Sequence, residues 1–444
     1  MPEYEILPID ASPTKDFFIS MLVKDIDLID AIADLVDNSV DGARGLRNDS
    51  DFSGLFVSIE IDSSSFKITD NCGGFSVDTA RRYAFKFGRP AEAGVLNHSI
   101  GRFGVGMKRA IFKIGKKFKI ESRTKDSYFL LEDDVDIWKS KPDDWTFQFT
   151  KVAEELSKLP SGECGTSIVV NALHQPVAED FTPEASNFLI RLSDDLSNAH
   201  RKAIIQGLQI SLNGKALAAD PLYLLQSEDL APAYKELVLD SSDGKVQVKI
   251  YSGIASAEPS AAGWYVFCND RAILKADQTG ITGWGEGSER SNPQYHNQFA
   301  RYRGYIFFDA ENPGALPWTT TKKNVDGDSS IYRAARVQMA LMMRPVINFL
   351  NKAASERTRG FETDDQPLEQ AIGRAKLAKL EEVIQQPEFK FPSVVNEPRI
   401  VDSGRIQYSK PLEDIARVKK RLKVSTLKDV GERTFQYFLE MECD

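Results

Sequence analysis

The sequence predicts an α+β protein whose main sheet is largely antiparallel. Short alternating runs of β-branched and aromatic residues occur in pairs joined by tight turns, and segments with a helical apolar period lie between them. The sequence lacks the regular strand–helix alternation that would indicate a doubly wound parallel sheet. Its 444 residues, of which 42% are hydrophobic, are enough for about three domains with apolar cores.

The first clear element is a helix that begins near Ile26. Its apolar residues recur with a period close to 3.6 as far as Val40. Asp34, Asn38 and Asp41 stand at positions i, i+4 and i+7, so their side chains line one face. This polar face is either a surface in contact with water or a set of groups that contact a ligand. The helix alone does not decide between the two.

A hairpin and two glycine turns follow this helix. Residues 54–62 and 65–70 are the predicted hairpin, and "DNCGGF", 70–75, is the turn at its end. A polar segment, 76–99, leads to "GRFGVG", 101–106, which opens an amphipathic helix with a basic side. Further strands are predicted at 116–124, 128–135 and 165–173. Backbone N–H groups in a glycine turn at a helix start can hold phosphate oxygens, although no clear strand precedes this one as a dinucleotide-binding fold requires.

The second half of the chain predicts another α+β region. A helical segment at 175–200 joins the two regions, and the hairpin 208–217, with an Asn-Gly turn, opens the second. Its strands are predicted at 245–255, 263–274 and 303–310. The loops 276–300 and 316–326 are polar, and 329–354 is a helix that Pro345 should kink.

The last part of the sequence is more polar. A linker is predicted at 355–367, then a helix at 368–386 and a proline-bearing stretch at 387–398. Two amphipathic helices, separated around Val424 and Ser425, complete the sequence. We therefore predict three domains, with the boundaries 1–180, 181–354 and 355–444.

Composition and charge narrow the functional class. The four cysteines are scattered and the four histidines show no zinc-ligand spacing, so neither a disulfide framework nor a structural zinc is expected. No signal peptide or membrane-spanning apolar run is visible, which predicts a soluble, cytoplasmic protein without a membrane partner. The net charge of −9 disfavours nucleic-acid binding by the whole surface. The basic stretches 108–123 and 417–423 are each either a solvated face or a local nucleic-acid surface.

Four motifs in order carry a family resemblance: "AIADLVDNSVDGA", "ITDNCGGF", "IGRFGVGMK" and "GTSIVV". Their order and spacing resemble the GHKL ATPases: gyrase, the ninety-kilodalton heat-shock chaperone, histidine kinases and MutL. The first motif is most similar to that of MORC proteins. The resemblance covers roughly residues 15–175 and implies a Bergerat-type ATPase sandwich, in which helices cover one face of a mixed, largely antiparallel sheet. It also implies ATP and Mg²⁺ as cofactors.

The resemblance implies a role for each polar position. Asp34 matches the general base that activates the attacking water, where the family usually has glutamate, so hydrolysis is expected to be slow. Asn38 matches the asparagine that binds Mg²⁺, and Asp41 lies on the same nucleotide-facing side. Asp70 matches the aspartate that accepts a hydrogen bond from the adenine amino group, and Thr166 matches a threonine beside it.

The glycine turns match less completely. Gly74 fits the second glycine of the family pattern D-x-G-x-G, whereas Cys72 stands at the first, so the turn is not expected to be identical. Residues 85–100 would form a lid over the nucleotide. The residues expected around the phosphates are Gly101, Arg102, Phe103, Gly104, Val105, Gly106, Met107 and Lys108.

The second half adds a further similarity. "GWYVFCNDRAIL" resembles the "VNxR" strand of the transducer domain that follows the ATPase domain in gyrase, MutL and MORC proteins, which implies a transducer-like β-α-β domain before the helical C-terminal region. In "WTTTKKNVD", Lys322 is the expected lysine that contacts the γ-phosphate, with Lys323 as the substitute. No phosphoacceptor-like histidine motif is present, so autokinase activity is not expected.

The functional expectation is an ATPase that acts as a nucleotide-gated clamp and dimerises when ATP binds. Three targets stay open. The clamp could enclose DNA in a MORC- or MutL-like process such as DNA repair or defence against foreign DNA. It could act on proteins as a chaperone does, or it could be a scaffold that signals to a partner protein through its C-terminal helices.

Overall fold

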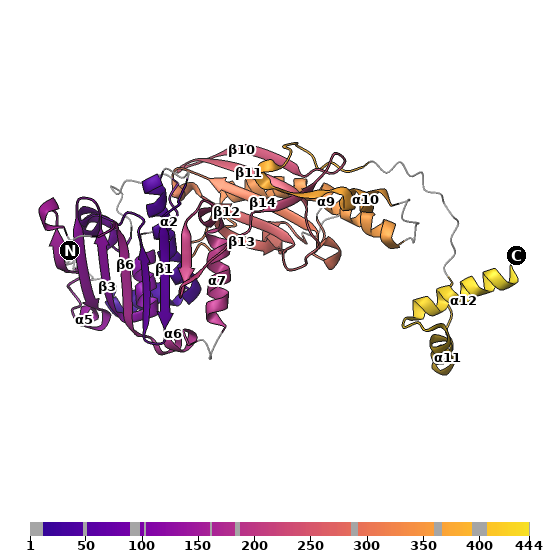
Figure 1. The fold of residues 1–444 in the computed structure, drawn as a ribbon, viewed down its shortest axis with the longest axis horizontal. Coiled ribbons are helices and arrows are strands. Elements are labelled where there is room, and N and C mark those ends of the chain that lie inside the picture. Colours follow the sequence, from indigo (N-terminus) through magenta and orange to yellow (C-terminus); the bar gives the residue numbers. More distant parts are fainter. Residues whose placement is uncertain are drawn as a thin grey trace, which may run out of the picture. The chain divides into compact units, whose positions relative to one another are not determined.

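One mixed sheet organises the first part of the described chain in the computed structural model (Figure 1), with the strand order β5-β4-β3-β6-β2-β1-β7-β8. Its strands are β1 Phe56–Asp62, β2 Ser65–Asp70, β3 Gly115–Arg123, β4 Tyr128–Asp134, β5 Phe149–Ala153, β6 Gly165–Leu173, β7 Gln209–Leu212 and β8 Lys215–Ala216. Neighbours are antiparallel except β1 and β7, which are parallel. The structure describes residues 12–47, 51–88, 98–101, 104–159, 162–182, 187–285, 292–358, 366–392 and 406–443. The predicted α+β class is confirmed.

Helices pack on one face of this sheet. In β1, Val57, Ile59 and Ile61 are buried while the residues between them are more exposed, as expected for a strand covered on one side. The predicted first helix is α2, Leu28–Arg47, which packs against α4, Gly106–Ile114. The other helices of this part are α1 Lys15–Lys24, α3 Val77–Thr79, α5 Val135–Lys139, α6 Gln175–Asp180, α7 Phe188–Ala199 and α8 Arg201–Ile205.

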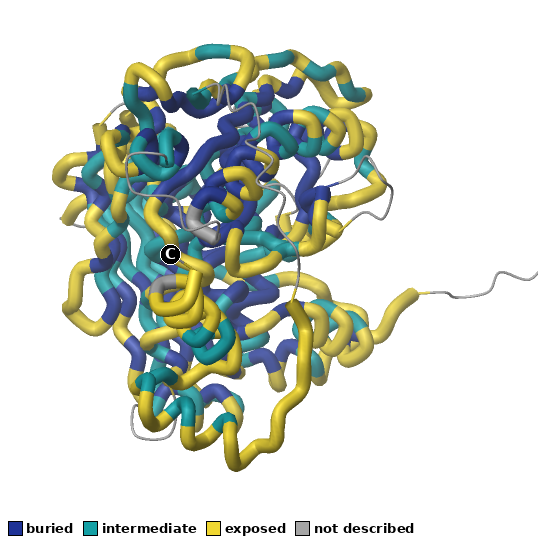
Figure 2. The backbone as a smooth tube through the Cα atoms, turned by 90° about the vertical axis from the view of Figure 1, so that its right-hand side faces the viewer, coloured by how far each residue is buried: buried dark blue, intermediate teal, exposed yellow. Residues whose placement is uncertain are grey.

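A second sheet, with the order β10-β11-β14-β12-β13, follows in the described chain. Its strands are β10 Ala233–Ser241, β11 Gly244–Ile254, β12 Gly263–Cys268, β13 Arg271–Asp277 and β14 Tyr302–Asp309. The long helix α9, Ser330–Thr358, packs along β11 and continues through Pro345. Central strands of the two sheets, such as β1, β12 and β14, contribute many of the buried residues, which are dark blue in Figure 2.

The hairpin 208–217 forms as predicted, but it does not open the second region. Its strands β7 and β8 extend the first sheet, because β7 pairs in parallel with β1. Ile210 lies opposite Val57 and Leu212 opposite Ile59, and all four side chains are buried. The pairing therefore continues the apolar face of β1, a contact between residues about 150 positions apart that the local pattern does not contain.

The predicted helix 368–386 is wrong in its second half. The helix α10 spans Pro367–Arg374, and the chain then forms β15, Lys376–Lys379, which pairs with β9, Tyr223–Gln226. The reason is tertiary packing. Leu380 and Val383, just beyond β15, are buried in an apolar cluster with Tyr251 of the second sheet.

Residues 393–444 form a separate unit whose described part is a pair of helices. They are α11, Leu412–Leu422, and α12, Leu427–Glu442, divided where the sequence predicted. Within 406–443 no side chain with a described environment is fully buried. Across the described parts of both units, every helix is too short or too polar to cross a bilayer.

Candidate functional site

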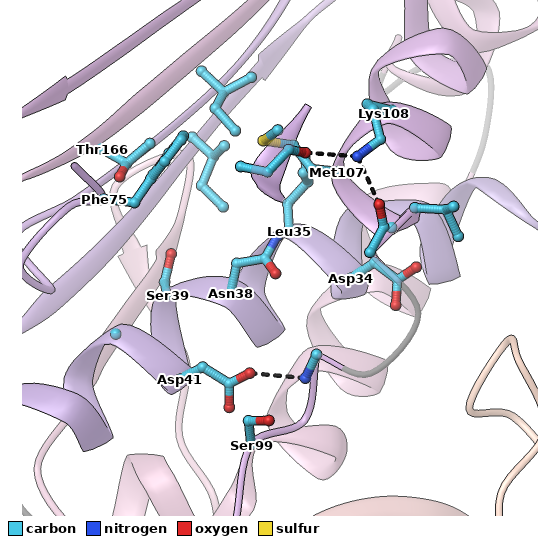
Figure 3. A pocket seen from close by; sticks show the side chains of 18 of the residues that line it. Asp34, Leu35, Asn38, Ser39, Asp41, Phe75, Ser99, Met107, Lys108 and Thr166 are labelled. Carbon is cyan, nitrogen blue, oxygen red and sulfur yellow. Dashed lines mark hydrogen bonds between the residues drawn. The ribbon is translucent and has the colours of Figure 1, made fainter. Parts of the chain in front are cut away.

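A cavity of about 520 Å³ lies beside the polar face of α2 (Figure 3). It is bordered by α2, the turn after β2, the start of α4 and the loop 316–326. The predicted site residues that line it are Asp34, Asn38, Asp41, Asp70, Gly74, Gly101, Gly104, Val105, Gly106, Met107, Lys108, Thr166 and Lys322. Arg102 and Phe103 lie outside the described residues, as do residues 89–97 of the predicted lid. The structure thus brings the separated motifs to one place.

Asn38 presents an available amide to this cavity. Its side chain is exposed, whereas Asp37 and Ser39 on either side are buried, and it lies among the lining side chains drawn in Figure 3. No described residue forms a hydrogen bond with the side-chain amide of Asn38. Such an oxygen suits Mg²⁺, which takes few protein ligands and completes its shell with phosphate and water oxygens. Within the described residues no cluster of three His, Cys, Asp or Glu offers a metal site of its own.

Asp41 anchors the segment that enters the second glycine turn. Its carboxylate accepts hydrogen bonds from the backbone N–H groups of Ile100 and Gly101, each at 2.8 Å. Burial raises the pKa of Asp41 to about 6, although these N–H groups and the Arg44 guanidinium act in the opposite direction. Asp41 therefore fixes backbone at the rim of the cavity, whatever contact it also makes with a ligand.

Asp70, the last residue of β2, also lines the cavity. Its carboxylate accepts hydrogen bonds from the Ser39 hydroxyl at 2.7 Å and from the backbone N–H groups of Cys72 at 2.9 Å and Thr166 at 3.3 Å. Burial raises the pKa of Asp70, and these three donors oppose the rise. The Thr166 hydroxyl lies 3.4 Å from that of Ser122. Helix α2 and strand β6 thus hold one carboxylate between them.

The turn between Asp70 and Phe75 shows why cysteine is accepted at the first family glycine position. Cys72 does not have a positive φ and is buried, whereas Gly73 and Gly74 have φ of 95° and 65°. A Cβ on Gly74 would lie 2.3 Å from the Arg123 carbonyl oxygen, so only glycine fits there. Gly73 and Gly74 adopt the left-handed backbone geometry, whereas position 72 does not and accepts a side chain.

Lys108 lines the cavity from the first turn of α4 and is buried. Its ammonium donates hydrogen bonds to the backbone carbonyls of Ala84 and Gly104, both at 2.6 Å (dashed in Figure 3). Burial lowers the pKa of Lys108 to about 7. The lysine therefore ties the short π-helical turn Ala80–Ala84 to the glycine turn and is poised to change charge near neutral pH.

Asp34, the predicted general base, has both carboxylate oxygens engaged. Oδ2 accepts a hydrogen bond from Arg109 at 2.6 Å, and Oδ1 accepts one from Lys322 at 3.0 Å. Lys322 comes from the loop after the second sheet and has φ of 55°, an uncommon conformation for a residue other than glycine. The lysine chosen from the sequence thus reaches α2, and it contacts the carboxylate rather than leaving it free.

Asp37 is the centre of a charged cluster that the sequence analysis did not identify. It is fully buried and pairs with Lys322 at 2.7 Å and with Arg271 at 2.9 Å. Burial alone would raise the pKa of Asp37, but the Arg271 guanidinium and the Lys322 ammonium hold it well below its usual range. His200 is neutral, because burial lowers its pKa to about 3. The one available signal was the arginine of the "VNxR"-like strand.

Two other cationic features have acidic partners. Lys323 pairs with Asp30 at 2.8 Å and Asp195 at 2.6 Å and does not line the cavity.

In the basic stretch 108–123, three lysines face carboxylates across β3, β4 and α5. These pairs are Lys116–Asp136, Lys117–Asp134 and Lys119–Glu132. Three lysines of this stretch therefore have acidic neighbours, while their side chains stay 43–65% exposed.

A largely antiparallel sheet with helices on one face, and a cavity beside two glycine turns, is consistent with a GHKL-type ATPase fold. Residues 26–166 match the family model described as histidine kinase-, DNA gyrase B- and HSP90-like ATPase. The match covers less than half of the chain, and it supports a nucleotide-binding ATPase of the GHKL superfamily in this region. A comparison with curated proteins found no match to the chain.

Proposed function

We propose that this protein is an ATP- and Mg²⁺-dependent ATPase that acts as a nucleotide-gated, dimerising clamp. The observation that carries the proposal is the convergence of four separated motifs and Lys322 on one cavity of about 520 Å³. A cavity of this size is in the range of small-molecule and cofactor sites. The polar groups that line it suit the parts of a Mg·ATP molecule. Asp70 would contact the adenine, Asn38 the magnesium ion and the glycine turn the phosphates.

Each side chain has a distinct task in this proposal. Asn38 would hold Mg²⁺, which neutralises phosphate charge beside the carboxylates of α2. Asp34 would accept a proton from the attacking water, using a lone pair that its two cations leave available. Its short side chain and its pairing with Arg109 and Lys322 both favour slow turnover.

Lys322 supplies the gate. Its ammonium pairs with Asp34 and Asp37, and a γ-phosphate in the cavity would compete with these carboxylates for it. The phosphate needs only a few kcal/mol of preference for one arrangement to shift the population of the loop 316–326. ATP and ADP would then be distinguished by whether Lys322 leaves α2.

Asp34→Asn tests the catalytic assignment. The amide keeps the size of the side chain but cannot take the proton, so we expect turnover to fall by about 100-fold or more with Mg·ATP affinity within a few-fold of wild type. Phosphate release and calorimetric binding measure the two quantities. Unchanged turnover would remove Asp34 from the proposed role.

The clamp is tested by light scattering of the full chain with Mg·ATP, Mg·ADP or a non-hydrolysable analogue. We expect dimers with ATP and the analogue only. Lys322→Met should abolish this response, and Lys323→Met is the matched control, because its partners Asp30 and Asp195 lie outside the cavity. A dimer that forms equally with ADP, or that ignores Lys322→Met, would contradict the gate.

DNA is the proposed target of the clamp, in a MORC- or MutL-like process. Three lysines of the 108–123 stretch have acidic neighbours, so the support comes from α11, where Arg417, Lys420 and Arg421 are exposed on one side. ATP-dependent, salt-sensitive DNA retention that is lost in Lys420→Glu/Arg421→Glu would agree with this target. If DNA retention is unaffected by this double change, α11 is not the DNA-binding surface.

A partner protein is the second candidate target. Phe435, Tyr437 and Phe438 of α12 are exposed within one turn, an aromatic group typical of protein interfaces. This candidate describes a scaffold that signals through its C-terminal helices. It predicts that Phe435→Ala/Phe438→Ala removes partner binding while DNA retention is unchanged.

A further inference from the structure

The segment 98–101 is held from two sides. Asp41 of α2 binds the N–H groups of Ile100 and Gly101, as described above, and Arg44 donates to the His98 carbonyl at 2.8 Å. From the other side, the His98 N–H donates to the carbonyl of Glu311, just after β14. Gly101 lines the cavity, so any shift of this segment moves its rim.

Asn269 makes the central contact from the second sheet. It stands with Asp270 in the two-residue turn between β12 and β13, where both residues have positive φ, 45° and 67°. Its side-chain Nδ2 donates to the Ser99 carbonyl at 3.2 Å and to the Ala310 carbonyl at 3.1 Å, while Oδ1 accepts from the Ala310 N–H at 3.0 Å. Asn269 is only 1% exposed, so water cannot replace these bonds easily.

Ser99 gives this contact a connection to the ligand. It lines the cavity beside Asp41 in Figure 3, and its hydroxyl is buried without a hydrogen-bond partner among the described residues. Buried hydroxyls are nearly always paired, so an orphaned one at a cavity wall indicates that a ligand or a water completes it. The backbone of the same residue is what Asn269 holds.

We propose that Asn269 is a positioning residue for the nucleotide, which sets the place of Ser99 and Gly101 at the cavity rim, and that the Ser99 hydroxyl contacts the bound nucleotide. This inference rests on the proposed function. It makes the β12–β13 turn the route by which the second sheet senses the nucleotide, because the turn continues directly into Arg271 and the Asp37 cluster.

The test compares Asn269→Gly with Asn213→Gly in the full chain. Glycine keeps the positive φ in both turns, and Asn213, with φ of 48°, likewise loses an amide that bonds both the N–H and the carbonyl of a distant residue, Ile61. Asn213 does not line the cavity. The measurements are the affinity for a Mg-loaded non-hydrolysable ATP analogue by calorimetry and backbone hydrogen exchange at Ile100 and Gly101.

Asn269→Gly should weaken analogue affinity by about 10-fold and accelerate exchange at Ile100 and Gly101 by a similar factor, since small misplacements of a site are costly. Asn213→Gly should stay within about twofold in both. Ser99→Ala should weaken affinity with exchange unchanged, because it keeps the carbonyl that Asn269 binds.

The outcomes separate the two proposals. If wild type binds the analogue and Asn269→Gly matches Asn213→Gly in affinity, the positioning role is overturned and the proposed function stands. Faster exchange without loss of affinity also overturns it, since the segment would then be fixed without being used. If wild type binds no nucleotide, the proposed function fails and this inference fails with it.

Discussion

Asp37 and Asp41 lie one turn apart on α2, the first fully buried and the second partly buried, and their pKa values shift in opposite directions. At the interior side of the helix, Arg271 and Lys322 keep the pKa of Asp37 well below its ordinary value despite its burial. At the cavity side, burial dominates and the pKa of Asp41 is raised to about 6. The difference teaches that cations supplied from more than 200 residues away, Arg271 and Lys322, lower the pKa of Asp37 while burial raises that of Asp41.

The largest effect is expected from Asp37→Ala at the interior side. It leaves Arg271 and Lys322 buried without their shared partner, so the free energy of unfolding should fall by about 3–5 kcal/mol. Urea unfolding followed by tryptophan fluorescence measures it. Asn38→Ala, at an exposed position of the same helix, is the control and should change stability by less than about 0.5 kcal/mol while losing Mg-dependent binding. Equal effects of the two changes would contradict the distinction between the sides.

Asp41→Asn sharpens the comparison through pH. Because the folded-state pKa of Asp41 is raised from 3.8 to about 6, the native state binds this proton more tightly, and its stabilising effect is lost as pH rises from about 4 to 6. The loss is about 3 kcal/mol at roughly 1.4 kcal/mol per pH unit. The difference in stability between wild type and Asp41→Asn should shift by this amount across the window. A pH-independent difference would show that Asp41 titrates normally.

The smallest effect concerns Lys108, a buried cation that no carboxylate compensates in its described contacts. Since burial lowers its pKa to about 7, most of it is neutral at pH 8, and a bound triphosphate should restore its charge. Nucleotide binding at pH 8 should therefore take up close to one proton. Calorimetry in buffers of different ionisation enthalpy measures the uptake, and Lys108→Met should abolish it. Persistent uptake in that variant would assign the proton elsewhere.

The residues on the cavity side of α2 could be predicted from the sequence because their pattern is local. Asp34, Asn38 and Asp41 repeat with the helix period, and the glycine turns mark their own backbone geometry. The charged cluster on the interior side could not be predicted, because the helix pattern around Asp37 does not show that Arg271 and Lys322 contact it. Lys108 differs in another way: its position was predicted, but its bonds to Ala84 and Gly104 depend on backbone that no pattern describes.

The same limit explains the errors in the fold. The Asn-Gly turn identified the 208–217 hairpin, but the local sequence does not show that Ile210 pairs with Val57 of β1, because this pairing depends on three-dimensional packing. Likewise, Lys376–Lys379 follows a genuine helix and becomes a strand because Tyr223–Gln226 offers it a partner. Local propensity predicted which segments are regular, and contacts distant in sequence chose their neighbours.

The parallel pairing of β7 with β1 has a practical consequence for dissecting the protein. A fragment cut after the region that matches the ATPase family, or at residue 180, would leave the hydrogen-bonding edge of β1 bare, and such edges recruit other chains into aggregates. In the intact chain the exposed border falls instead on β8, which is two residues long and begins with Lys215. Short, lysine-bearing borders resist strand addition. A truncation intended to isolate the nucleotide site therefore has to retain the chain through Leu217.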